Sequence, residues 1–234
     1  MLDFHGKQVL VTGGTSGIGR SIAEAFSVAG AGVIALGLPP NDQLPDTIET
    51  RILDVTDEGA INRFIGSLEA LDVVVNAAGV IYRDREFDLD VFKRVLDVNL
   101  VGAMRVSKAA YPKLRVTGGC IVNIASMLSF FGGGRVPAYS ASKGGIVQLT
   151  RSLAVAWATG GIRVNAVAPG WISTPLTQPL QDDLKRSAEL VGRTPLGRWG
   201  RTEEVAGPVL FLASELASFI TGAVLPVDGG YSIF

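Results

Sequence analysis

The chain has 234 residues, of which 47% are hydrophobic and 29 are glycine, and its formal net charge is −1. This balance gives no basic field for nucleic acid or an anionic membrane. No apolar run is long enough to span a bilayer and the N-terminus lacks a signal-peptide pattern, so we expect a cytoplasmic protein. The single cysteine, Cys120, and the single histidine, His5, argue against a disulfide framework, a metal site and a histidine-based triad.

Seven short apolar segments alternate with longer helical patterns. Their hydrophobicity is continuous, which indicates strands buried on both faces with helices between them. We therefore predict an α/β protein, a single Rossmann-fold domain over residues 1–234, with a doubly wound parallel sheet of about seven strands and helices on both faces. The predicted strands are Gln8–Thr12, Val33–Leu36, Arg51–Val55, Val73–Asn76, Ile121–Ala125, Arg163–Val167 and Ala223–Val227.

A glycine-rich turn follows the first predicted strand and opens a helix that extends to about Ala29. Glycines allow close backbone approach, and the free N–H groups at a helix start suit a pyrophosphate. The spacing is Gly-x-x-x-Gly-x-Gly, which differs from the usual dinucleotide fingerprint. We predict that the turn binds the phosphates of a dinucleotide through Gly13, Thr15, Ser16, Gly17, Ile18 and Gly19.

The second strand ends at Gly37 and Leu38. Neither offers a carboxylate for a ribose 2′-hydroxyl or a cation for a 2′-phosphate, and the absence of a basic residue favours NAD over NADP. The following segment, Gly37 to Glu49, contains three prolines, so we expect a loop with at most a short helical turn.

The third and fourth strands are expected to complete the nucleotide site. Asp54 and Val55 close the third strand, where the carboxylate either accepts the adenine amino group or caps the next helix, for which Asp57 is the better candidate. Small residues close the fourth strand and leave room for a flat ring, in the run Asn76-Ala77-Ala78-Gly79.

Tyr139 and Lys143 lie four residues apart in a predicted helix, Tyr139–Trp157, and therefore on one face of it. A phenol beside a fixed ammonium can act as a general base. Alone, the pair is better explained as an interfacial tyrosine and a snorkelling lysine. A second predicted helix, Leu89–Tyr111, contains Asn99, which we expect to bond backbone or water locally.

With these motifs in order, the chain resembles the short-chain dehydrogenase/reductase family over essentially its whole length. The matching motifs are Thr12-Gly13-x-x-x-Gly17-x-Gly19, Asn76-Ala77-Ala78-Gly79, Asn99, Ser126, Tyr139-x-x-x-Lys143 and Pro169-Gly170. Ala77 departs from the second Asn that is usual in the family. The resemblance implies a nicotinamide cofactor, NAD or NADP, and a homotetramer assembled through the two helices named above.

The resemblance also implies roles for individual residues. Tyr139 exchanges the proton with the substrate oxygen, to which Ser126 hydrogen-bonds. Lys143, together with the positive nicotinamide, favours the phenolate and also holds the nicotinamide ribose. Asn99 anchors a water that links Lys143 to solvent. The cofactor contacts implied near the sixth strand are Pro169, Gly170, the backbone of Ile172 and the hydroxyl of Thr174.

Further segments resemble a sugar-acid branch of the family that includes 2-dehydro-3-deoxy-D-gluconate 5-dehydrogenase and 2-deoxy-D-gluconate 3-dehydrogenase. They are residues 124–130, 134–137, 186–190 and 197–200. An anionic, polyhydroxylated substrate needs a cation away from the reacting carbon, and Arg135 and Arg83 are our candidates for a carboxylate clamp. Arg193 and Arg198 are further options, and each arginine is alternatively a solvated or intersubunit side chain.

Residues around 174–197 follow the sixth strand and are predicted to form a lid over the substrate. The alternative is an ordinary surface loop.

Three functions are compatible with the sequence. The first is an NAD-dependent dehydrogenase that acts on a secondary hydroxyl of a sugar acid. The second is a 3-oxoacyl-(acyl-carrier-protein) reductase, for which we expect NADPH and a basic docking face, or another alcohol or polyol dehydrogenase. The third is a catalytically idle nucleotide-binding protein, against which the intact set Asn99, Ser126, Tyr139 and Lys143 argues.

Overall fold

The computed structural model describes residues 2–39 and 44–233, and in these residues seven parallel strands form one sheet. The strands are β1 (Gln8–Thr12), β2 (Gly32–Gly37), β3 (Ile48–Ile52), β4 (Val73–Asn76), β5 (Cys120–Ile124), β6 (Arg163–Pro169) and β7 (Val224–Val227). Their order is β3-β2-β1-β4-β5-β6-β7. The order reverses between β1 and β4, where such sheets open a ligand crevice at their carboxyl ends. The predicted doubly wound Rossmann fold is confirmed.

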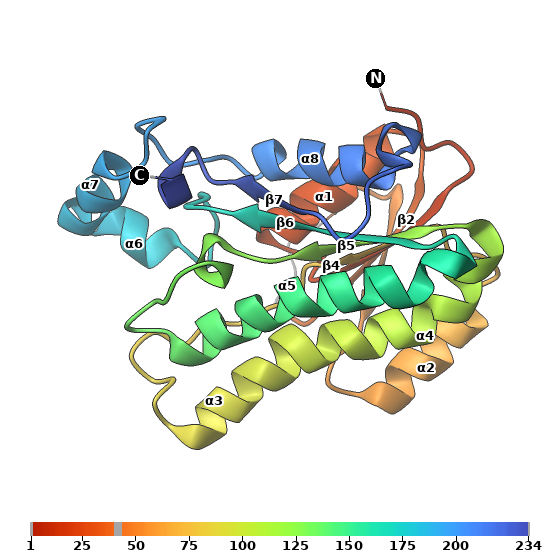
Figure 1. Ribbon diagram of the computed structural model, residues 1–234, viewed down its shortest axis with the longest axis horizontal. Coiled ribbons are helices and arrows are strands. Elements are labelled where there is room, and N and C mark those ends of the chain that lie inside the picture. Colours follow the sequence, from red (N-terminus) through yellow and green to blue (C-terminus); the bar gives the residue numbers. More distant parts are fainter. Residues whose placement is uncertain (1, 40–43, 234) are drawn as a thin grey trace.

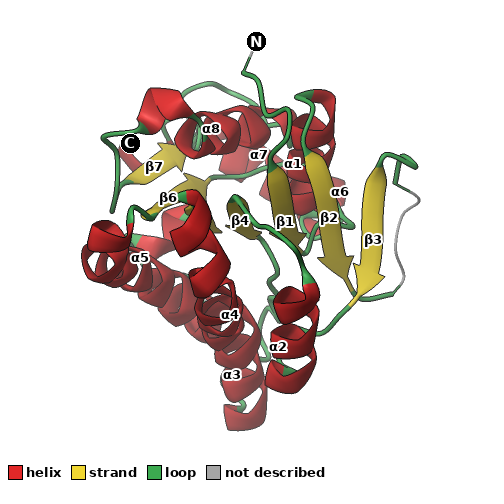
Figure 2. Cartoon of the chain, turned by 90° about the vertical axis from the view of Figure 1, so that its right-hand side faces the viewer, coloured by secondary structure: helices red, strands yellow, loops and turns green. Residues whose placement is uncertain are grey.

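Helices cover both faces of the sheet (Figure 1) (Figure 2). One layer holds α1 (Gly17–Val28) and α8 (Glu203–Ala213), and the other holds α2 (Glu58–Ser67), α3 (Leu89–Leu96), α4 (Gly102–Thr117) and α5 (Pro137–Trp157). Side chains along β1 point alternately to the two faces of the sheet. Val9 and Val11 pack in the hydrophobic cluster that includes α1, and Leu10 packs in the cluster that includes α2 and α4. Two short helices, α6 (Gln178–Asp182) and α7 (Leu184–Gly192), lie apart from both layers, at the left of Figure 1.

The third strand differs from its prediction. Arg51–Val55 is wrong as a strand, because β3 begins at Ile48 and ends at Ile52. Asp54 Oδ1 accepts a hydrogen bond from Thr56 N at 2.8 Å, and such a side-chain turn ends the strand. Since β3 is an edge strand with mostly exposed residues, it lacks the apolar run that marks the buried strands.

The predicted helix Leu89–Tyr111 is helical over its whole length, but it is not a regular α-helix. A π-helical turn, Asp97–Val101, separates α3 from α4, which continues to Thr117. Such turns are frequent at functional sites, and this one carries Asn99. Helix α5 begins at Pro137, two residues earlier than expected, because proline is favoured at the first helical position.

The expectation of a loop between β2 and β3 agrees with the described part of the segment. Residues 38–39 and 44–47 contain no helix, and residues 40–43 lie outside the described residues.

Buried polar side chains link the centre of the sheet to the α4–α5 layer. Asn76 Nδ2 donates to Asn123 Oδ1 at 2.9 Å and to Ser107 Oγ at 3.1 Å. Asn123 Nδ2 donates to Thr150 Oγ1 at 2.9 Å. All four side chains are buried, so each bond satisfies a group that water cannot reach.

Replacing Asn123 with leucine tests this polar chain. The variant removes one of the two acceptors of the buried Asn76 amide and the donor to Thr150, and we expect a loss of about 2 kcal/mol or more in the free energy of unfolding. Urea denaturation measures it, with Gln148→Leu on the exposed side of α5 as the control. A loss no larger than that of the control would contradict the assignment.

Candidate active site

The four predicted catalytic residues come together at the carboxyl end of β5. Ser126 follows this strand, Tyr139 and Lys143 lie in the first turns of α5, and Asn99 comes from the π-helical turn. Lys143 Nζ lies 5.6 Å from the centroid of the Tyr139 ring. The Ser126 hydroxyl lies near enough to the Tyr139 phenol to lower its pKa. Lys143 is buried, and its Nζ donates to the Ile124 carbonyl at 2.7 Å.

A short 3-10 turn, Met127–Ser129, fixes Ser126 relative to α5. Ser126 Oγ accepts from Leu128 N at 3.1 Å, and Ser126 N donates to Ser129 Oγ at 3.2 Å. Ser129 Oγ donates in turn to the Lys143 carbonyl at 2.7 Å. This capping box fixes the buried Ser126 side chain at the end of β5, beside α5.

Asn99 ties the loop after β4 to α5. Its Oδ1 accepts from Val80 N at 2.8 Å, and its Nδ2 donates to Val80 O at 3.0 Å and to Ser142 Oγ at 3.1 Å. A Cβ added at Gly79 would lie 3.4 Å from Asn99 Oδ1 and 3.8 Å from Lys143 Nζ. Asn99 therefore hydrogen-bonds to the backbone, as the sequence predicts. Gly79 lies close to both Asn99 and Lys143.

The environment moves the pKa values of the two titrating groups apart. Burial lowers the pKa of Lys143 to about 8. Burial raises the pKa of Tyr139, while the Ser126 hydrogen bond and the positive charge of Arg83 oppose that rise. The phenol therefore depends on neighbouring donors and cations to lose its proton.

Two adjoining cavities, of about 350 and 180 Å³, share Gly13, Ser16 and Gly79 and form a continuous site. The larger reaches Tyr139, Lys143 and Thr174, and the smaller reaches Leu38 and Asp54. A Cβ at Gly19 would lie 2.1 Å from the Gly13 carbonyl oxygen, so this tight turn requires glycine. An elongated site with a glycine-lined helix start at its centre fits a dinucleotide.

Most of the predicted cofactor contacts line these cavities: Gly13, Thr15, Ser16, Gly17, Ile18, Gly19, Leu38, Asp54, Val55, Ala77, Gly79, Tyr139, Lys143 and Thr174.

The other four predicted cofactor contacts, Asn76, Pro169, Gly170 and Ile172, do not line these cavities. Asn76 belongs to the polar chain described above. Pro169 ends β6 and is buried. Gly170 packs so closely on Asp228 that a Cβ would lie 2.7 Å from its Cα. Ile172 is buried and faces a different cavity, beside Trp171.

Asp54 does not cap α2, so that one of its two predicted roles is wrong, and the adenine contact stays a prediction. It lines the nucleotide cavity, and it accepts hydrogen bonds from Thr56 N and Oγ1 at 2.8 Å. Burial raises the pKa of its carboxyl, but these bonds and Arg94 hold it below the ordinary value. Asp57 caps α2, as predicted, by accepting from Ala60 N at 2.8 Å. Arg94, which the sequence did not single out, lies 3.4 Å from Asp54 Oδ2 at this cavity.

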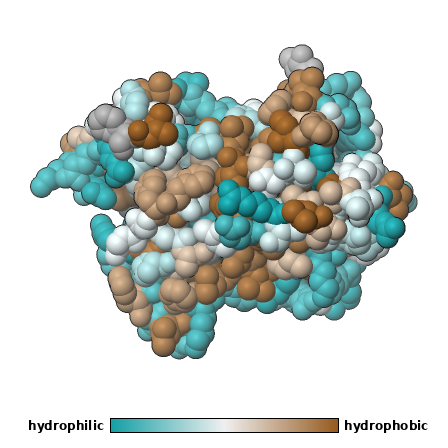
Figure 3. Space-filling model, viewed as in Figure 1, coloured by the Kyte–Doolittle hydropathy of each residue, from teal (hydrophilic) through white to brown (hydrophobic). Residues whose placement is uncertain are grey.

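A third cavity, of about 220 Å³, lies beside the catalytic cluster. It is lined by Arg83, Met127, Leu128, Phe131, Gly132, Gly133, Gly134, Arg135, Val136, Trp171, Leu180, Arg186, Arg193 and Tyr231. The segment from Met127 to Val136 forms one wall, and α6, α7 and the C-terminal residues form the other. In the space-filling view the exposed side of α6 and α7 is largely hydrophilic (Figure 3).

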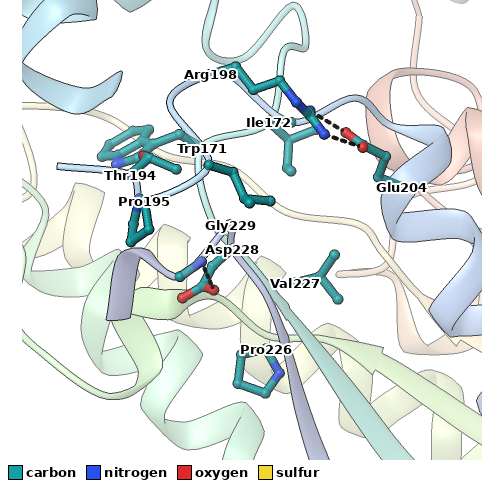
Figure 4. Close-up of a pocket in the computed structure, with 13 residues that line it drawn as sticks. Trp171, Ile172, Thr194, Pro195, Arg198, Glu204, Pro226, Val227, Asp228 and Gly229 are labelled. Atoms are coloured by element: carbon teal, nitrogen blue, oxygen red, sulfur yellow. Dashed lines mark hydrogen bonds and ion pairs between the residues drawn. The ribbon is translucent and has the colours of Figure 1, made fainter. Parts of the chain in front are cut away.

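Two of the four candidate arginines, Arg135 and Arg198, form ion pairs with carboxylates. Arg135 grips Asp84 with Nε and a second nitrogen, the former at 2.7 Å from Oδ1. Arg198 grips Glu204 with contacts of 2.8 and 2.6 Å, in a separate cavity of about 500 Å³ (Figure 4). The guanidinium N–H groups of Arg135 and Arg198 are therefore already bound to carboxylates.

Arg83 and Arg193 have no carboxylate partner within residues 2–39 and 44–233. Arg83 is half-buried, and burial lowers its pKa. The Arg193 guanidinium stacks 4.5 Å from the centroid of the Tyr231 ring and 5.6 Å from that of Phe131. Stacking uses the faces of a guanidinium and leaves its edge donors available to an anion.

Neither a metal site nor a membrane span is found in the part of the chain that the structure describes. It contains no group of three or more His, Cys, Asp or Glu residues able to hold a metal ion. None of its helices is long and apolar enough to cross a bilayer.

Known proteins resemble this chain along nearly its full length. Residues 13–232 match a family model described as enoyl-(acyl carrier protein) reductase. The 2-dehydro-3-deoxy-D-gluconate 5-dehydrogenase of Bacillus subtilis (strain 168) is 42% identical over 97% of this chain and 94% of its own. The 3-oxoacyl-(acyl-carrier-protein) reductase FabG of Thermotoga maritima is 37% identical over 98% and 99% of the two chains.

A solved structure shows the same fold at similar identity. It is an Agrobacterium tumefaciens protein described as a 2-deoxy-D-gluconate 3-dehydrogenase with bound NADP. Its TM-score is 0.92 at 38% identity, and the match covers 99% of this chain and 98% of that one.

The depressed pKa of Lys143 predicts a pH-dependent stability. An unfolded lysine titrates near ~10.4, so between pH 8 and that value the unfolded chain holds a proton that the folded chain lacks. Burying the charged lysine lowers the free energy of unfolding at low pH, and raising the pH removes this loss. From pH 7.5 to 10 the free energy of unfolding of the wild type should therefore rise by about 2 kcal/mol relative to that of Lys143→Met. Urea unfolding without cofactor measures the difference, and equal pH dependences of the two proteins would refute the depressed pKa.

Proposed function

We propose that this chain, which belongs to the short-chain dehydrogenase/reductase family and is an NAD(P)-dependent oxidoreductase acting on a CH–OH group, oxidises or reduces a sugar acid such as a deoxy-gluconate. The observation that carries the choice of substrate is the cavity beside Tyr139, where neither Arg83 nor Arg193 forms an ion pair with a carboxylate of the described residues. A carboxylate is the group that such guanidinium forks bind. The Bacillus relative, which acts on a deoxy-gluconate by its name, agrees with this chemistry.

The catalytic residues divide the proton chemistry among them. Tyr139 takes the proton from the substrate hydroxyl during oxidation, or gives it to the carbonyl oxygen during reduction. Ser126 donates a hydrogen bond to the same oxygen and fixes its position. Lys143 favours the phenolate through its charge, and Asn99 fixes the loop that faces the lysine and would anchor a water there. The bound cofactor supplies or accepts the hydride at C4 of its nicotinamide ring.

The residues that would hold the cofactor are those that line the two adjoining cavities, with the phosphates at the start of α1. Leu38 and Thr15 are uncharged, and Arg94, which also lines this cavity, is paired with Asp54, which supports NAD as the favoured cofactor. The relative from Agrobacterium contains NADP, so NADP is the alternative to assay.

The substrate carboxylate is assigned to Arg83 and Arg193, on opposite walls of the cavity. Arg193 follows α7 directly, so residues 174–197, which also include α6, would act as a lid whose closure brings this cation to the substrate. Arg135, the other predicted contact, shapes the wall while paired with Asp84. By resemblance to its family we further propose a cytoplasmic homotetramer with contacts through α4 and α5.

A second candidate function is reduction of a 3-oxoacyl group on a carrier protein. The Thermotoga relative favours it, and the catalytic cluster would serve this reaction equally well. Other alcohols and polyols are further candidates. The cationic cavity favours the sugar acid over these neutral substrates.

Substituting Tyr139 with phenylalanine tests the reaction. The change removes the proton carrier with little change of shape, and we expect turnover to fall by about 10² to 10⁴. The assay is a panel of sugar acids, polyols and 3-oxoacyl thioesters, each with NAD(H) and NADP(H). Full turnover by Tyr139→Phe would disprove its role, and activity confined to neutral ketones would disprove the sugar-acid assignment.

Substituting Arg83 or Arg193 with alanine tests the carboxylate contact. Each change removes a charge-assisted bond, so kcat/KM for the sugar acid should fall about tenfold to a hundredfold. Arg135→Ala is the matched control, with an expected change below threefold, because Asp84 already occupies its fork. Equal losses for a polyol that lacks the carboxylate would show that these arginines do not bind the acid group.

A further inference from the structure

Glu86 is a fully buried carboxylate in the loop between β4 and α3, close to the catalytic cluster. Its Oε1 accepts a hydrogen bond from Tyr82 N at 3.0 Å, and its Oε2 accepts one from Tyr139 N at 2.8 Å. Its side chain is 0% exposed. It forms no ion pair with any residue that the structure describes. Burying a carboxylate is unfavourable unless donors compensate it, so both backbone bonds are needed.

Helix α5 lacks a cap of its own at the end that carries the catalytic residues. The preceding residue, Val136, has no side-chain acceptor, and the first helical residue, Pro137, has no N–H. Tyr139 is the third residue of the helix, where a free N–H normally bonds to a capping side chain. Glu86 supplies this acceptor from a different segment, and its charge faces the positive end of the helix dipole.

We infer that Glu86 is a positioning residue for the reaction, which fixes the backbone of Tyr139 so that its phenol meets Ser126 and the substrate oxygen. The same carboxylate fixes the backbone of Tyr82, the neighbour of Arg83. One buried side chain thus sets the spacing between the proposed carboxylate contact and the proton-transfer group. The inference rests on the proposed role of Tyr139.

The variant Glu86→Gln separates positioning from simple packing. Glutamine has nearly the same shape, but it offers an acceptor to only one of the two N–H groups and turns its NH₂ donor toward the other. A residue that merely fills space would tolerate this change.

The matched control is Asp88→Asn, in the same loop. Asp88 caps α3 by accepting from Asp90 N at 2.8 Å and Val91 N at 3.2 Å, and it does not contact the backbone of Tyr139. A general loss of helix capping in this loop would therefore affect both variants, whereas loss of Tyr139 positioning would affect only Glu86→Gln.

We expect kcat of Glu86→Gln to fall about tenfold to a hundredfold, as for a small misplacement of a catalytic group. The Kd for the cofactor, measured by calorimetry, should stay within twofold of the wild type, and Asp88→Asn should keep its kcat. Any secondary alcohol of the panel that the wild type oxidises serves as substrate. Wild-type kcat in Glu86→Gln, or the same loss in Asp88→Asn, would overturn the inference.

Hydrogen exchange at the Tyr139 amide supplies a readout that needs no substrate, so it remains decisive if the proposed function fails. We expect a protected amide in the wild type and in Asp88→Asn, and faster exchange in Glu86→Gln. If that variant does not fold, Glu86→Asp and the wild type are measured instead. A wild-type amide that exchanges as fast as in a free peptide would overturn the inference.

Discussion

The hydrogen bond from the Lys143 ammonium to the Ile124 carbonyl is the constraint around which the active site is arranged. It joins α5 to the last residue of β5 and places a cation in the interior of the protein. Because burial lowers the pKa of this lysine to about 8, its protonation state near neutral pH depends on the groups beside it. The Tyr139 ring, with its centroid 5.6 Å from Nζ, and the Ile124 carbonyl lie beside it, and electrostatic interactions are stronger in such a buried site than in water.

The central strands and the catalytic cluster were predictable because each depends on a local pattern. Continuous apolar runs mark strands buried on both faces, and the four-residue spacing of Tyr139 and Lys143 places them on one helix face. The edge strand β3 was misplaced because it lies at the edge of the sheet and is only half covered, and the π-helical turn at Asp97–Val101 has no signal in hydrophobic periodicity.

The parts of the site that the sequence did not reveal are those set by contacts across the chain. Arg135 was the favoured carboxylate contact, yet its pairing with Asp84 depends on a loop 51 residues away. Arg193 was only a further option in the sequence, and its stacking on Tyr231, from the C-terminal end of the chain, is seen only in the fold. Glu86 looks like an ordinary surface glutamate in sequence, and only the fold shows that it caps the catalytic helix. Cationic and capping partners of this kind follow from tertiary structure.

The crystal structure of the enzyme with NAD(H) and a deoxy-gluconate tests the account most directly. We predict the reacting oxygen of the sugar acid within hydrogen-bonding distance of Tyr139 and Ser126, its carbon about 3–3.5 Å from C4 of the nicotinamide, and its carboxylate on Arg83 and Arg193. A carboxylate bound elsewhere, with these two guanidinium groups facing solvent, would contradict the proposed substrate. A reacting oxygen away from Tyr139 would contradict the proposed mechanism.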